Sequence, residues 1–230
     1  MKHVLITGGS NGLGKVTAVK LVESGFSVTI LSQDLETTKA AAEETGCNYV
    51  IADVADHNAL QTAVKEAVHT APIDILINNA GMWIQGELES NELENIKRVM
   101  EVNVLGVIYT TQAVITGMKE RKRGRIINIM SQGGLYAKAE RSVYTASKWA
   151  LTGFTKTMQL ELKPFNISVD AFYPGALKSP DEKDIFSKAG NKRDMSKALD
   201  MSHVADAIAY ACKLPDGVRV TELGIESLSY

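Results

Sequence analysis

Short apolar runs alternate with longer amphipathic segments along nearly the whole chain. The short runs are continuous rather than alternating in polarity, which is typical of strands buried on both faces of a sheet. They predict strands at 3–7, 27–31, 48–52, 74–78, 125–130, 167–173 and 219–223. The longer segments carry apolar residues at helical spacing and predict helices at 13–24, 35–45, 56–70, 89–118, 142–163 and 202–213.

The strict alternation of strands and helices predicts an α/β fold, a doubly wound parallel sheet of about seven strands with helices on both faces. No linker, repeat or low-complexity segment divides the chain, so we expect a single domain over residues 1–230. The stretch 177–201 is polar, weakly periodic and long for a connection. These properties suit a loop that covers a binding site, and we predict a substrate lid there.

Composition narrows the functional classes. The net charge of −2 offers no broad basic surface for nucleic acid, and the basic cluster at 119–125 reads as a solvated helix end. Cys47, Cys212 and the four histidines match no metal-ligand spacing, so no metal is expected. The N-terminus lacks a signal-peptide core, and no apolar run approaches the roughly 18 residues of a membrane span. We therefore expect a cytoplasmic protein without a membrane partner.

A glycine-rich turn joins the first predicted strand to the first predicted helix. It reads Thr7-Gly8-Gly9-Ser10-Asn11-Gly12-Leu13-Gly14. Glycines allow positive φ and a close backbone approach to a ligand, and the helix start beyond offers free N–H groups to a pyrophosphate. Such a turn also occurs without a ligand, but its place in a doubly wound pattern favours dinucleotide binding.

Tyr144 and Lys148 lie four residues apart in a predicted helix and therefore share one face. A free tyrosine has a pKa near 10, too high for acid–base work at neutral pH. A neighbouring ammonium is expected to lower it and make the phenol a general acid. Taken alone, a Tyr–Lys pair at this spacing is far more often structural, a decoration of the surface, than functional.

These motifs together resemble the short-chain dehydrogenase/reductase family, of the single-domain kind often termed classical. Thr7, Gly8, Gly12 and Gly14 match its T-G-x-x-x-G-x-G turn, and Tyr144 with Lys148 its Y-x-x-x-K pair. Further matches follow in order over residues 3 to about 180: Asp53, Asn78-Asn79-Ala80-Gly81, Asn103, Ser131 and Pro174-Gly175.

The resemblance implies a Rossmann fold and an NAD(P)-dependent oxidoreductase that transfers a hydride between nicotinamide and a carbonyl/alcohol substrate. It implies catalytic roles for Ser131, Tyr144 and Lys148, and a proton-relay water held by Asn103. It implies cofactor contacts at Gly8, Ser10, Asn11, Gly12, Leu13, Gly14, Ser32, Gln33, Asp53, Val54, Asn79, Ala80, Gly81, Tyr144, Lys148, Pro174, Gly175, Leu177 and Ser179. Besides Ser131 and Tyr144, the candidate substrate-pocket residues are Met82, Trp83, Leu135, Tyr136, Ile185 and Phe186, a set that favours a hydrophobic ketone or aldehyde.

The sequence departs from the family pattern in three places. The V-D-G-G ending of many members is absent, Ser179 stands where a threonine is usual, and Met130 replaces the first serine of the common I-S-S. The first departure puts the C-terminal side of the pocket in doubt.

The cofactor determinants point weakly to NADP. Ser32 occupies the position of the acid that selects NAD, and Gln33 the position of the arginine frequent in NADP users. Asn11 replaces a basic residue of many NADP users. Asp34 is the contrary sign, because a small backbone shift would bring its carboxylate to the ribose of NAD.

Several alternatives stay open at this level. They are an NAD-dependent alcohol dehydrogenase of the same family, a non-catalytic dinucleotide-binding sensor, and a sugar-nucleotide epimerase, which would need a longer C-terminal part. Apolar residues on the helices at 89–118 and 142–163, such as Val107, Ile108, Phe154 and Met158, predict a homodimer or homotetramer.

Overall fold

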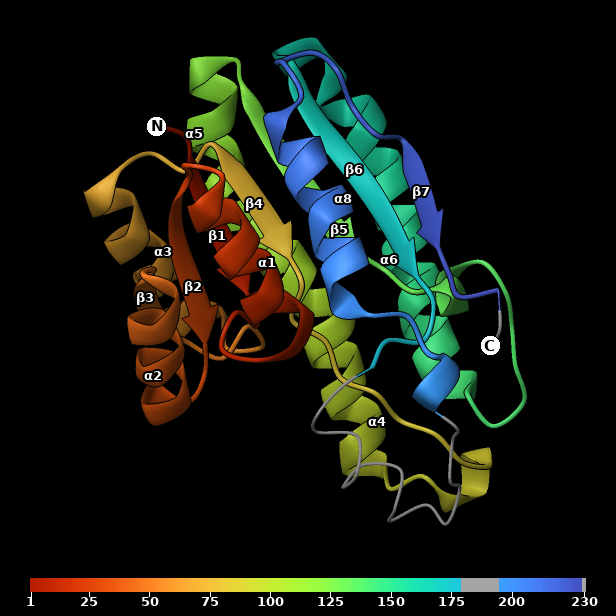
Figure 1. Cartoon of the computed structure of the whole chain (residues 1–230). Coiled ribbons are helices and arrows are strands. Elements are labelled where there is room, and N and C mark those ends of the chain that lie inside the picture. Colours follow the sequence, from red (N-terminus) through yellow and green to blue (C-terminus); the bar gives the residue numbers. More distant parts are fainter. Residues whose placement is uncertain (179–194, 229–230) are drawn as a thin grey trace.

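The computed structural model describes residues 1–178 and 195–228 and contains one parallel sheet. Its seven strands lie in the order β3-β2-β1-β4-β5-β6-β7 (Figure 1). The strands are β1 (His3–Thr7), β2 (Ser27–Ser32), β3 (Asn48–Ile51), β4 (Ile75–Asn78), β5 (Gly124–Ile129), β6 (Ile167–Pro174) and β7 (Glu222–Ile225). The doubly wound α/β Rossmann fold expected from the sequence is confirmed.

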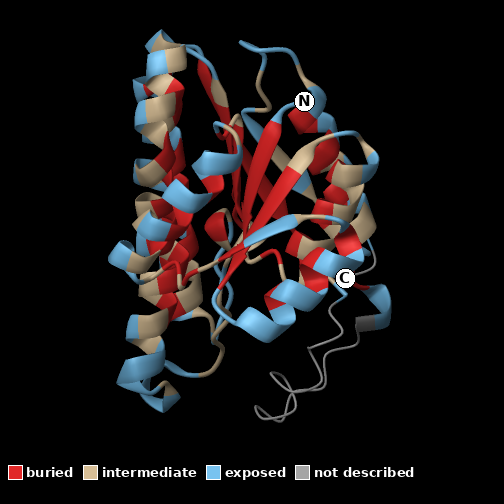
Figure 2. Cartoon of the chain, turned by 90° about the vertical axis from the view of Figure 1, so that its left-hand side faces the viewer, coloured by how far each residue is buried: buried red, intermediate tan, exposed pale blue. Residues whose placement is uncertain are grey.

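Helices cover both faces of this sheet, and Figure 2 shows the buried strands between the two helical layers. One layer packs on a core cluster shared by α1 (Gly12–Glu23), α2 (Leu35–Thr45) and α8 (Met201–Lys213). The other packs on clusters shared by α3 (His57–Thr70), α5 (Gly106–Arg121) and α6 (Ser142–Glu161). The remaining helical elements are α4 (Leu93–Met100) and short turns at Leu88–Ser90, Glu101–Leu105, Gln132–Gly134, Lys163–Phe165 and Met195–Lys197.

Local sequence signals explain where several helices begin and end. Asp34, Asp56 and Asp200 each accept a hydrogen bond from a backbone N–H in the first turn of α2, α3 and α8. Gly46 ends α2 in the left-handed conformation, with φ of 72°. The predicted boundaries of these helices therefore hold to within one or two residues.

The helix expected at 89–118 is not one continuous α-helix. It comprises α4, a π-helical segment at Glu101–Leu105, and α5. The π turn inserts one extra residue into the helix and frees backbone groups locally, a feature that is common near functional sites. Asn103 lies inside it and is fully buried. The last strand also differs from expectation, since β7 spans Glu222–Ile225 rather than 219–223.

Residues 179–194 of the expected lid lie outside the described part of the chain. The two ends of that stretch are held together by backbone pairing. Leu177 and Leu199 form a parallel bridge, Lys178 N donates to Leu199 O at 2.9 Å, and Leu199 N donates to Ala176 O at 2.8 Å.

One helical segment corrects the expectation that no stretch is long enough to cross a membrane. Leu93–Arg121 is 29 residues long, and its most apolar 18-residue window has a mean hydropathy of 1.3, so the segment passes that test by length and composition. Of its most apolar window, 44% is buried inside the fold. Val102, Val114 and Met118 belong to the core cluster beneath α3 and α5, and a core helix of a soluble protein passes the same test.

Candidate active site

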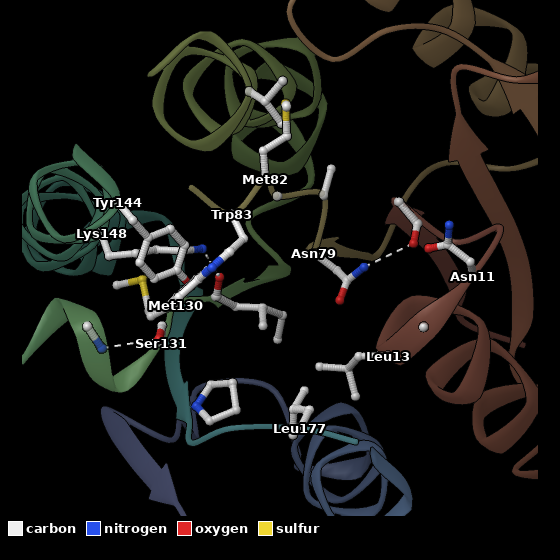
Figure 3. A pocket seen from close by; sticks show the side chains of 18 of the residues that line it. Asn11, Leu13, Asn79, Met82, Trp83, Met130, Ser131, Tyr144, Lys148 and Leu177 are labelled. Atoms are coloured by element: carbon white, nitrogen blue, oxygen red, sulfur yellow. Dashed lines mark hydrogen bonds between the residues drawn. The ribbon is translucent and has the colours of Figure 1, made fainter. Parts of the chain in front are cut away.

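A cavity of about 600 Å³ opens at the carboxyl ends of the central strands. β1 and β4 are neighbours there although more than sixty residues separate them in sequence, with Thr7 paired to Asn78. Ligands of open α/β sheets bind in the crevice at such a switch in strand order. Figure 3 shows Ser131, Tyr144, Lys148 and Trp83 on one side of this cavity and Asn11, Leu13 and Asn79 on the other.

The glycine turn forms the floor of one half of the cavity. Gly8 and Gly12 have φ of 66° and 51°, a region that side chains other than glycine rarely adopt. A Cβ on Gly14 would lie 2.1 Å from the carbonyl oxygen of Gly8, and a Cβ on Gly9 would lie 2.6 Å from the side chain of Ile30. The turn thus needs glycine for conformation at two positions and for space at two others.

Thr7 and Asn79 clasp this turn to the end of β4. Thr7 Oγ1 accepts hydrogen bonds from the backbone N–H groups of Asn79 and Ala80, both at 3.1 Å. Asn79 Nδ2 donates in return to the carbonyl oxygens of Thr7 at 3.1 Å and Gly8 at 3.0 Å. These four hydrogen bonds join the end of β1 to the end of β4 and so hold the glycine turn in place beneath the cavity.

The N-terminus of α1 points into this half of the cavity without a side-chain cap. The N-cap residue Asn11 makes no capping hydrogen bond, and the first turn contains no acidic residue. The helix start therefore presents free N–H donors and the positive end of the helix dipole, which is an anion-binding arrangement.

The opposite half of the cavity gathers three side chains from two elements. Ser131 follows β5, and its Oγ accepts a hydrogen bond from Gly133 N at 3.1 Å. Tyr144 and Lys148 project from the start of α6, and the Lys148 Nζ lies 5.7 Å from the Tyr144 ring centroid. Lys148 Nζ donates to the Ile129 carbonyl oxygen at 3.3 Å.

Burial sets the proton affinities of these groups. It lowers the pKa of Lys148 from 10.5 to about 8, because a desolvated ammonium is disfavoured. It raises the pKa of Tyr144, while Ser131 and the Arg141 guanidinium act in the opposite direction. The expectation that Lys148 lowers the tyrosine pKa is therefore not met. Desolvation has the largest effect on the pKa of Tyr144, and the nearby charge that lowers this pKa is that of Arg141.

Asn103 in the π turn forms hydrogen bonds with the loop after β4 and with α6. Its Oδ1 accepts from Met82 N at 2.7 Å and its Nδ2 donates to Met82 O at 2.9 Å. The same Nδ2 donates to Ser147 Oγ at 3.0 Å, and Ser147 Oγ donates to the Tyr144 carbonyl oxygen at 2.7 Å. Its side chain thus holds the loop after β4 against the first turn of α6.

Trp83 packs against Tyr144 with its ring tilted by 57°. The Trp83 ring lies 4.3 Å from the Tyr144 ring, centroid to centroid, and the Arg141 guanidinium lies 4.8 Å from the Trp83 ring. Contacts of this kind restrict the orientation of the tyrosine ring.

The family model described as short chain dehydrogenase matches residues 2–190. The chain belongs to this family. It is also similar to 3-dehydrosphinganine reductase of Danio rerio, with 38% identity over 189 residues that make up 77% of this chain and 57% of that protein. Carbonyl reductase family member 4 of Xenopus laevis is 30% identical over 217 residues, 93% of this chain and 92% of that protein.

Among solved structures, an alcohol dehydrogenase from Thermococcus sibiricus complexed with 5-hydroxy-NADP superposes with a TM-score of 0.89 and 26% identity. The match covers 100% of this chain and 98% of that one. The chain spans only about 57% of the length of the vertebrate relatives named 3-dehydrosphinganine reductase and 3-ketodihydrosphingosine reductase.

Most residues that the short-chain dehydrogenase motifs single out do line the cavity. The exceptions are informative: Gly14 and Asn103 lie just behind its wall, where they shape it through Gly8 and Met82. Leu135 was expected in the substrate pocket but packs in the cluster around Leu151 instead. Ser179, Ile185 and Phe186 lie outside the described residues. The predicted residues that line the cavity are Gly8, Ser10, Asn11, Gly12, Leu13, Ser32, Gln33, Asp53, Val54, Asn79, Ala80, Gly81, Met82, Trp83, Ser131, Tyr136, Tyr144, Lys148, Pro174, Gly175 and Leu177.

Asp34 and Arg98 alter the expected picture of the cavity's adenosine end. The Asp34 carboxylate caps α2, accepting from Thr37 N at 2.8 Å and Thr37 Oγ1 at 2.7 Å, so it is not directed at a ribose. Arg98 of α4 reaches the cavity and its Nη2 lies 2.6 Å from Asp53 Oδ2. Sequence motifs did not indicate Arg98, because a single arginine on a helix carries no local signal.

The described residues fit a dinucleotide. The glycine turn would clash with any added Cβ at its closest points, and the uncapped α1 N-terminus faces a pyrophosphate position. Ser32 Oγ accepts from Ser10 N at 3.2 Å, which leaves its O–H free to donate to a ligand. No group of three or more metal-ligating side chains occurs among the residues that the structure describes.

The buried ammonium of Lys148 gives a pH signature. Below pH 8 the folded protein bears the cost of burying this charge, and above the unfolded pKa of 10.5 neither state carries it. Relative to Lys148→Met, the free energy of unfolding of the unmodified protein should rise by about 3 kcal/mol between these limits. Denaturant unfolding across this pH range measures it. Lys97→Met, at an exposed lysine of α4, is the control, and equal pH slopes for the protein and Lys148→Met would refute the assignment.

Proposed function

We propose that this protein is an NAD(P)-dependent oxidoreductase that reduces a hydrophobic ketone or aldehyde, with NADPH as the preferred reductant. The observation that carries the proposal is the convergence of Ser131, Tyr144 and Lys148 on a cavity whose other half is a glycine cradle. Family membership and relatives named as ketone or carbonyl reductases support it.

Tyr144 acts as the general acid. When bound, the nicotinamide supplies the hydride to the carbonyl carbon. The Tyr144 hydroxyl donates its proton to the carbonyl oxygen as negative charge develops there. Ser131 Oγ already accepts from Gly133 N, so its own O–H is available to donate to the same oxygen. The two hydroxyls would therefore hold one substrate oxygen between them.

Lys148 lies next to Tyr144 and assists its proton transfer. Its Nζ uses one N–H on the Ile129 carbonyl oxygen, which fixes the ammonium against β5 and leaves two donors for the cavity side. With its pKa near 8, it holds or releases a proton close to neutral pH. Asn103 acts as a positioning residue, since both ends of its amide are used to hold Met82 and Ser147. Its role in a water relay remains a prediction.

The substrate side of the cavity supports an apolar substrate. Met82, Trp83 and Tyr136 line it beside Tyr144. Sulfur and aromatic side chains offer broad apolar contact with few fixed polar partners, which suits an aliphatic or aromatic ketone. Turnover with a panel of carbonyl compounds tests this assignment. Faster turnover of small charged keto acids than of such ketones would overturn it.

We extend the proposal to assembly and location. Of the residues expected to pair, Val107 lies in the core, and Phe154 and Met158 are partly buried against it. The exposed apolar residues of this region are instead Trp149 and Leu160 on α6 and Leu105 in the π turn before α5, and they support pairing of these helices in a homodimer or homotetramer. Light scattering of the purified chain measures its mass directly. A cytoplasmic location stays a proposal that fractionation of cells expressing the chain would test.

Tyr144→Phe should reduce carbonyl-dependent NADPH oxidation by at least about a hundredfold, because the general acid is lost while the ring and its contact with Trp83 are kept. Absorbance of the reduced nicotinamide follows the reaction. Tyr210→Phe, at an exposed tyrosine of α8, is the matched control and should keep normal turnover. Near-normal turnover of Tyr144→Phe would show that another group donates the proton.

The catalytic efficiency should be higher with NADPH than with NADH. Asp34 is engaged in capping α2, and Ser32 and Gln33 offer hydrogen bonds at the position where an acid would exclude a 2′-phosphate. Gln33→Arg should raise the NADPH preference further by adding a cation. The ratio of kcat/KM values decides the question. A native preference for NADH beyond tenfold, about 1.4 kcal/mol, would reverse the assignment.

A further inference from the structure

Arg98 crosses the adenosine end of the cavity from a helix that carries none of the dinucleotide motifs. Its Nη2 lies 2.6 Å from Asp53 Oδ2 and 3.3 Å from Gln33 Oε1. Asp53 follows β3 and Gln33 follows β2, so one guanidinium joins two strand ends and α4. The guanidinium also belongs to the cavity wall.

Arg98 is the cation at an end of the cavity that is otherwise bordered by acidic and neutral side chains. Asp34 and Asp53 both border it, while Ser10, Asn11, Ser32 and Thr37 are neutral. Two carboxylates would repel a phosphate group that carries nearly two negative charges. The other cationic side chains among the described residues of the cavity wall are Lys138, Arg141 and Lys148. Arg141 and Lys148 lie beside Trp83 and Tyr144, at the opposite end.

The contacts of Arg98 with Asp53 and Gln33 are weak enough for a ligand phosphate to replace Asp53. The side chains of Arg98 and Asp53 are 30% and 32% exposed, and partly exposed ion pairs of this kind contribute little net stability. A guanidinium forms stronger, bidentate hydrogen bonds with a phosphate than with a single carboxylate oxygen. Gln33 uses its amide oxygen on Arg98, which leaves its NH₂ group as a second donor.

We propose that Arg98 is the residue that selects NADP over NAD, by leaving Asp53 and binding the 2′-phosphate together with Gln33. The exchange would free the Asp53 carboxylate for the adenine amino group, the role that the family resemblance implies for it. This inference rests on the NADPH preference in the proposed function. It assigns the cation that decides this preference to α4, where it acts together with the neutral Gln33 of the turn after β2.

Binding of nucleotide fragments tests the assignment without any hydride transfer. Calorimetric titration with adenosine 2′,5′-bisphosphate and with 5′-AMP compares ligands that differ only in the 2′-phosphate. The unmodified protein should bind the bisphosphate more tightly, and Arg98→Gln should lose at least tenfold of that preference while its affinity for 5′-AMP is kept or improved. Arg98→Lys should keep part of the preference. Lys97→Gln, at the exposed neighbour of Arg98 on α4, should keep all of it.

Several results would contradict the assignment of NADP selection to Arg98. Equal affinity of the unmodified protein for both fragments, a preserved preference in Arg98→Gln, or an equal loss for both fragments would overturn the proposal. The double variant Arg98→Gln/Asp53→Asn separates direct contact from simple neutralisation of Asp53. Recovery of the full preference in this variant would also overturn it. Because the fragments carry no nicotinamide, absence of ketone reduction leaves this test intact, and its failure leaves the reductase activity untouched.

Discussion

The site depends first on a close approach of backbones at the crevice between β1 and β4. The Thr7 hydroxyl and the Asn79 amide tie the two strand ends together through four hydrogen bonds. Gly14 packs so closely on this clasp that an added Cβ would lie 2.1 Å from the Gly8 carbonyl oxygen and 2.6 Å from Asn79 Nδ2. The direction of α1, and with it the anion-binding helix start, follows from this contact.

Burial dominates the chemistry of the opposite half of the cavity. Lys148 is almost fully buried beneath the tyrosine, and its desolvation brings the pKa of the ammonium to about 8. Desolvation likewise raises the pKa of Tyr144. A tyrosine kept protonated in this way is suited to donate a proton in reduction, and the nearby Arg141 charge limits the rise.

The two ends of the cavity are built by different means. The catalytic end is cross-linked by hydrogen bonds, because Asn103 in the π turn joins the loop at Met82 to α6 through Ser147. The adenosine end is held by the partly exposed ion pair of Arg98 and Asp53, which a ligand can replace. The first arrangement fixes reacting groups, and the second allows the protein to distinguish ligands by charge.

Apolar periodicity and motif spacing are local properties of the chain, so the sequence predicted the fold class, most strand and helix positions, and the candidates Ser131, Tyr144 and Lys148. Packing in three dimensions was needed to reveal the π turn that divides the helix at 89–118, the burial that reverses the expected pKa direction of Tyr144, and the packing of Leu135 against the cluster around Leu151. It also decided that Asp34 caps α2 and that Arg98 meets Asp53. These outcomes depend on contacts and solvent exclusion between segments far apart in sequence, which no local pattern records.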